Sequence, residues 1–162
     1  MPHTFTDAAD RMWTIPMTVG SIRRVENALG YNLANAAEPA EEGESPLLTR
    51  LAIDPALLVD VVYVLVQPQA EKQGVDDLQF GEAIDGDAYG RLSEAFWGAL
   101  TDFFLGVGRS DTVRAIERQT QILKDATQKA GDRIDRLEID VDAALDASAR
   151  GASALKSPAD SA

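Results

Sequence analysis

The chain has 162 residues, 45 % of them apolar, which is enough for one domain with a hydrophobic core and a tail. A formal net charge of -12 argues against partners that are bound by charge neutralisation, namely nucleic acid and anionic membrane surfaces. Cysteine is absent and the single histidine, His3, lies near a terminus, which excludes thiol chemistry and disfavours histidine-based catalysis. We therefore expect no enzyme and no cofactor.

The first residues predict a flexible start followed by one short strand. Residues 1–12 are polar and acidic, so we expect them to be flexible, and no basic segment precedes an apolar run as in a signal peptide. The next stretch, "MWTIPMT", alternates apolar and other side chains. This alternation predicts a short strand that Pro16 limits to the edge of a sheet.

A helix and an acidic loop are expected next. Thr18 is typical of a helix N-cap, and Val19, Ile22, Val25 and Leu29 recur at helical spacing until Gly30 ends the run. Residues 35–44, "NAAEPAEEGE", contain no large apolar side chain. We expect this segment to be a solvated, mobile connection.

The stretch "DPALLVDVVYVLVQP", residues 54–68, raises the question of a membrane span. Only twelve residues lie between its prolines, fewer than the roughly 20 that a span needs. Ser45–Pro46 and Asp54–Pro55 are typical helix starts, so the stretch is expected to be a central helix that ends at Pro68. Asp60 and Tyr63 are its only positions expected to face outward, which makes them candidate partner-binding residues.

Two more helices are expected before residue 108. Asp76 and Gln79 form a capping-box pattern for a short helix that buries Phe80 and Ile84 and ends at Gly86. Asp87 is expected to cap the following helix, which ends in "GVG" at 106–108. Its apolar stripe favours a core role, with a groove for an apolar helix of another protein as the alternative. The aromatic candidates for such a groove are Phe96, Trp97, Phe103 and Phe104.

From residue 109 the pattern changes to heptads. Uncharged residues alternate at spacings of three and four from Val113 to Ala144, with charged residues on both sides. We expect one long helix over residues 109–148 and a disordered tail over 149–162. The acidity belongs to residues 1–108, which hold seventeen Asp/Glu against six Lys/Arg. The fold class is thus mainly α: a helical domain over 13–108, with at most a short N-terminal strand, then a long amphipathic helix.

Motifs for chemistry are weak. The aspartates at 76–87 do not place oxygen ligands at the positions of an EF-hand loop, so helix capping explains them better than a metal. "FLGVGRSD" (104–111) lacks the lysine and the preceding strand of a P-loop. Nothing marks two of the 27 acidic residues as a catalytic pair across a cleft.

Three segments, in this order, resemble a known family. They are "TVGSIRRVENALGYNL", "LLTRLAIDPALLVDVVYVLVQPQAEKQGVDDLQFGEAI" and "FWGALTDFF", preceded by a tryptophan-containing strand and together spanning about residues 13–105. The pattern is similar to that of bacteriophage tail assembly chaperones. The resemblance implies a non-catalytic protein of the host cytoplasm that coats the amphipathic tape-measure protein and forms homo-oligomers. It also implies that residues 109–162 are either the short form's own tail or an extension made by ribosomal frameshifting.

Two other functions stay open. One is a structural phage tail or head–tail connector component, which would remain in the finished particle. The other is an unrelated helical adaptor that the heptads of residues 110–148 join into a coiled coil.

Overall fold

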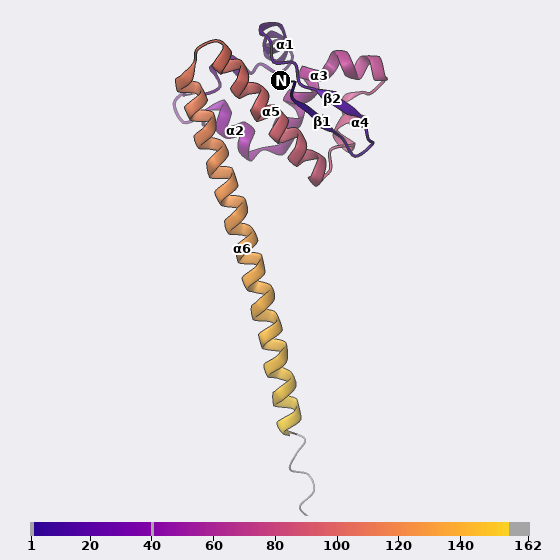
Figure 1. The fold of residues 1–162 in the computed structure, drawn as a ribbon, viewed down its shortest axis with the longest axis vertical. Helices are drawn as coiled ribbons and strands as arrows, with labels where there is room; N and C mark the ends of the chain where they lie inside the picture. The colour runs from indigo at the N-terminus through magenta and orange to yellow at the C-terminus, as the bar shows by residue number, and fades with distance from the viewer. Residues whose placement is uncertain (1, 40, 156–162) are drawn as a thin grey trace, which may run out of the picture. The chain divides into compact units, whose positions relative to one another are not determined.

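The computed structural model describes residues 2–39 and 41–155, and its side chains are described up to Ala149. The chain forms two compact units, residues 1–121 and 122–162. The first contains two short strands, α1 to α5 and the start of α6, and the described part of the second is the rest of α6 (Figure 1). The predicted fold class, mainly α with a minimal N-terminal sheet and a long C-terminal helix, is confirmed.

The N-terminus is a β-hairpin, so the prediction of a flexible segment over residues 1–12 is wrong. Strands β1 (Thr4–Thr6) and β2 (Met12–Thr14) pair antiparallel, with Phe5 opposite Trp13. Both of these side chains are buried, and burial of their apolar surface stabilises the hairpin on the helices. His3 adds a contact to α5, where its Nε2 lies 2.6 Å from Oδ2 of Asp102.

Asp7 organises the hairpin loop. Its carboxylate accepts hydrogen bonds from the backbone N–H groups of Ala9 and Arg11, the Arg11 side chain and the Trp13 indole N–H, at 2.9 to 3.0 Å. Burial raises the pKa of Asp7, but these hydrogen bonds outweigh burial and leave the pKa below its ordinary value. Asp7, which lies in the segment predicted to be flexible, is therefore a buried carboxylate that holds the hairpin loop together.

Helix α1 (Val19–Leu29) begins and ends where the sequence predicts. Thr18 caps it in a capping box with Ser21, and Gly30 ends it in the left-handed conformation. A short 3-10 helix, η1 (Leu33–Asn35), follows and buries Leu33. The described residues of the acidic loop after Ala37 are exposed, as expected of a solvated connection.

Helices α2 (Leu47–Ile53) and α3 (Pro55–Gln73) are joined at Asp54, which caps α3 through the N–H of Leu57. The predicted start at Ser45 is wrong by one position, because Pro46 occupies the N-cap of α2 and no side chain caps it. Helix α3 packs against α1, α2, α4, α5 and β2, which confirms it as the central helix.

Pro68 does not end α3, contrary to the prediction. The helix runs five residues further, to Gln73, before Gly74 caps it in the left-handed conformation. A proline here removes one helical hydrogen bond. The continuation is held by tertiary contacts: the Gln69 side chain exchanges two hydrogen bonds with the backbone of Thr14 on β2, and Ala70 is buried.

Helix α4 (Asp77–Glu82) has the predicted capping box between Asp76 and Gln79, but it ends at Glu82 and not at the predicted Gly86, so Ile84 lies beyond it. Helix α5 (Gly86–Gly106) is capped by Asp85 rather than by Asp87. The carboxylate of Asp85 accepts from the N–H of Ala88 at 2.8 Å, so the helix starts two residues earlier than predicted.

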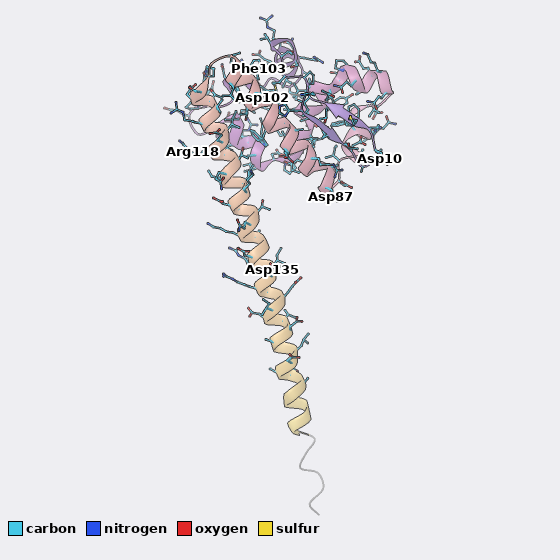
Figure 2. The ribbon with its side chains drawn as sticks, in the orientation of Figure 1. Asp10, Asp87, Asp102, Phe103, Arg118 and Asp135 are labelled. Atoms are coloured by element: carbon cyan, nitrogen blue, oxygen red, sulfur yellow. The ribbon has the colours of Figure 1, made fainter. Side chains whose placement is uncertain are left out.

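Helix α6 (Ser110–Leu155) belongs to both units. Its first turns pack in the first unit, where Thr112, Val113 and Ile116 are buried. In the second unit the side chains from 124 to 149 are all exposed, and Figure 2 shows them, Asp135 included, along this single helix. The helix passes the predicted end at 148 and reaches Leu155, so residues 149–155 are not a coil; residues 156–162 of the predicted tail lie outside the described residues.

Candidate functional site

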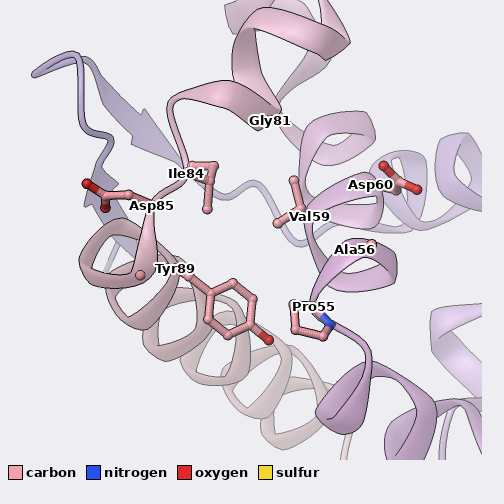
Figure 3. Close-up of a pocket in the computed structure, with 9 residues that line it drawn as sticks. Pro55, Ala56, Val59, Asp60, Gly81, Ile84, Asp85 and Tyr89 are labelled. Carbon is pink, nitrogen blue, oxygen red and sulfur yellow. The ribbon is translucent and has the colours of Figure 1, made fainter.

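An open cleft lies between the N-terminal half of α3 and the segment that joins α4 to α5. It encloses about 540 Å³, within the range of about 300–1,000 Å³ found for ligand pockets. All of its walls belong to the first unit. Its lining residues, shown in Figure 3, are Pro55, Ala56, Val59, Asp60, Gly81, Ile84, Asp85, Gly86 and Tyr89.

Local helix signals build both walls. The Asp54–Pro55 start sets the first turn of α3, and helical spacing then places Ala56, Val59 and Asp60 on one side of it. On the other wall, Gly81 and Gly86 carry no side chain, and a Cβ at either position would meet nothing within 4 Å. The two glycines therefore leave the cleft open above its apolar floor.

The interior of the cleft is apolar and its edges are acidic. In Figure 3 Val59, Ile84 and Tyr89 are directed into the gap, while the carboxylates of Asp60 and Asp85 point away from it on opposite sides. The three interior side chains are half-buried. An apolar group can thus enter between them without displacing a charged side chain.

Neighbouring carboxylates set the electrostatics of the cleft. Although Asp60 is exposed, partial desolvation beside the cleft raises its pKa, and the charges of Asp54 and Asp77 raise it further. Burial and Asp54 likewise raise the pKa of Tyr89. Because these carboxylates repel one another, a cation at the cleft would relieve the repulsion. The site suits an apolar group flanked by Lys or Arg.

Of the two α3 residues predicted to face a partner, only Asp60 lines the cleft. Tyr63 lies one turn further along the same side of α3, is half-buried, and has its ring centroid 5.5 Å from that of Phe80. Burial and the charges of Asp77, Asp76 and Glu71 raise the pKa of Tyr63. Tyr63 therefore packs on Phe80 beside the cleft and does not line it.

Of the four α5 aromatic residues predicted as candidates for a partner groove, three belong to the core. Phe96, Trp97 and Phe104 are all at most 6 % exposed, and only Phe103 is half-buried. An open binding surface made of Phe96, Trp97 and Phe104 is therefore wrong, because these side chains are buried in the first unit, whereas Phe103 stays a predicted partner-binding residue. The sequence analysis did not identify Val59 and Tyr89 as cleft residues, and it assigned Ile84 to the core. Only Tyr89 could have been found from the sequence, because it is an aromatic residue outside the apolar stripe of α5.

Comparisons with protein-family models, with curated proteins and with solved structures find no match to this chain. In the described part of the chain, no group of three or more His, Cys, Asp or Glu side chains is arranged to hold a metal ion. No single helix among the described residues is long and apolar enough to cross a membrane. Helices α2 and α3 reach that length and composition only together, across a bend of 108°.

Proposed function

We propose that this protein is a non-catalytic phage tail assembly chaperone of the host cytoplasm, which binds amphipathic helices of the tape-measure protein and keeps them soluble. The order of apolar segments over residues 13–105 supports this family. The observation that carries the proposal is the apolar cleft of the first unit with carboxylates at its edges.

The chemistry of the cleft matches that of an amphipathic helix. Such a helix presents apolar side chains every three or four residues, and its anchor residues bind in apolar grooves. Val59, Ile84 and Tyr89 offer half-buried apolar surface for one anchor. Lysine or arginine one turn away on the partner would lie close to Asp60, where a cation relieves the repulsion among the carboxylates.

The net negative charge of the chain would also keep a bound partner helix in solution. The chain carries a net charge of -12, and most of it belongs to residues 1–108. A partner helix covered by this unit would acquire a strongly negative surface, and net charge of one sign keeps proteins apart in solution.

A second candidate function is a coiled-coil adaptor or a permanent structural component of a particle. It is favoured by the exposed apolar side chains of α6, among them Ile134, Leu137 and Val141. Detection of the chain in purified particles would favour the structural component over a chaperone that leaves before completion.

Co-expression with the tape-measure protein tests the proposal. We expect a soluble complex that purifies by a tag on either chain. Ala56→Arg should abolish it, because the new side chain fills the cleft and repels a basic partner. Ala28→Arg is the matched control, since Ala28 is also an exposed helical alanine and lies outside the cleft. No complex with wild type, or equal effects of the two variants, would contradict the proposal.

A further inference from the structure

The heptad pattern of α6 leaves one seam of the helix free of charged side chains. Between Val113 and Ala144 the ten positions of the seam, a and d in heptad notation, carry no charge, although charged residues occur throughout the same segment. The a positions are Val113, Thr120, Thr127, Ile134 and Val141, and the d positions are Ile116, Leu123, Ala130, Leu137 and Ala144. All five a residues are β-branched.

The start of the seam is already occupied. Val113 and Ile116 are 6 % and 1 % exposed because they pack within the first unit. Further along, Ile134, Leu137 and Val141 are each 57 % exposed. The same seam is therefore buried at one end of α6, half-buried at Leu123 and exposed from Thr127 to Ala144.

We propose that residues 123–144 of α6 pair with the same segment of a second copy as a parallel, in-register, two-stranded coiled coil. β-Branched residues at a combined with leucine at d favour two parallel strands. Ile134 and Val141 at a, with Leu123 and Leu137 at d, follow this rule.

The flanking charges fit the same register. In a parallel pair, the residue before an a position lies beside the partner residue five positions later, and here that places Arg133 beside Glu138 of the second copy. Twofold symmetry makes this opposite-charge pair twice. The other flanking pairs join Gln119 to Lys124, Ala126 to Gly131 and Asp140 to Leu145, so no like charges meet.

The residues at the centre of the seam are small, which limits the stability of the proposed dimer. Thr127 and Ala130 bury little apolar surface. The Thr127 hydroxyl donates to the Leu123 carbonyl at 2.9 Å within its own helix, so the threonine layer leaves no hydrogen-bond donor unpaired. We expect a dimer that dissociates on dilution, held mainly by residues 134–144.

Sedimentation of the full chain over a concentration series tests self-association. The wild type should pass from monomer to dimer. Leu137→Asp should raise the dissociation constant at least tenfold, while Ile139→Asp should leave it within about twofold. Ile139 is the matched control, because it is 67 % exposed on the same helix but lies outside the seam. A wild type that stays monomeric, or equal effects of the two variants, would overturn the proposal.

Cysteine crosslinking tests the parallel register, and the absence of native cysteine makes single variants unambiguous. Val141→Cys should form an intermolecular disulfide under mild oxidation, and Ile139→Cys should form much less. In addition, Arg133→Glu should weaken the dimer and Arg133→Glu with Glu138→Arg should restore it. Equal crosslinking of the two cysteine variants, or no rescue by the charge exchange, would refute this arrangement.

Discussion

Gly98 on α5 lies where the N-terminal hairpin meets the helix, and replacing it tests whether that contact exists. A Cβ at Gly98 would lie 2.7 Å from Nδ1 and 2.8 Å from Cε1 of His3, closer than real side chains approach. The same imidazole contacts Asp102, one turn further along α5. Gly98→Ala must therefore displace His3. Gly90 on the same helix is the control, because a Cβ there would meet nothing within 4 Å.

Both substitutions replace a helical glycine with alanine, so both gain the same helix propensity. They differ because only the Cβ at position 98 meets His3. Alanine in place of glycine inside a helix stabilises by about 0.5–1 kcal/mol, and Gly90→Ala should show this gain. Gly98→Ala has the same gain but loses the His3–Asp102 pair, which is partly exposed and contributes at most about 1 kcal/mol, together with packing of the imidazole. We expect Gly98→Ala to be neutral or destabilising, about 1–2 kcal/mol below Gly90→Ala.

Urea unfolding at fixed pH measures the free energy of unfolding of both variants. Each substitution is made once in the wild-type chain and once in a chain that carries His3→Ala. When His3 is alanine, Gly98→Ala should stabilise as much as Gly90→Ala, because the obstructing ring is gone. If Gly98→Ala stabilised fully with His3 present, His3 would not lie on α5, and the N-terminus would be as free as its sequence suggests.

Three further predictions concern Asp7, Pro68 and Asp60. Asp7→Asn should lower the free energy of unfolding by about 2–3 kcal/mol, because an amide cannot accept all of the donors around it. Since the folded pKa of Asp7 lies below the ordinary value, its contribution is present near neutral pH and is lost as pH falls through that lowered pKa, which an acid titration of stability would detect. Pro68→Ala should raise the urea midpoint by restoring a helical N–H; a lower midpoint would mean that the α3 backbone needs proline there. Because the pKa of Asp60 is raised, Asp60→Asn should stabilise the fold at neutral pH, with the difference vanishing below the unfolded pKa, and should weaken binding of a basic partner helix.

Helix boundaries with local chemical signals were predictable. Thr18, Asp54 and Asp76 each cap a helix as their sequence context indicates, because capping needs only a few consecutive residues. Ser45 and Asp87 also fit a cap pattern, but the neighbouring residues Pro46 and Asp85 occupy the N-cap positions. At Pro68 a distant contact outweighs the local rule. Pro68 should end α3, yet Gln69 bonds to the backbone of Thr14 and the helix continues.

The hairpin and the cleft depend on contacts that single-sequence patterns do not report. Thr4–Thr6 and Met12–Thr14 each carry one buried aromatic residue between two less buried neighbours, a strand signal too short to stand alone. The cleft joins Val59 to Tyr89, thirty positions apart, and its apolar floor is a by-product of how α3 meets α5. Asp60 was found because a charge inside an apolar run is visible in the sequence.

Amide NMR spectra of the labelled chain, recorded with overlapping peptides from a tape-measure protein, test the central claim most directly. An amphipathic peptide with flanking Lys or Arg should shift resonances of Val59, Asp60, Ile84 and Tyr89, and Ala56→Arg should remove these shifts. Shifts confined to residues 123–144, or no shifts with any peptide, would contradict a chaperone that binds through this cleft.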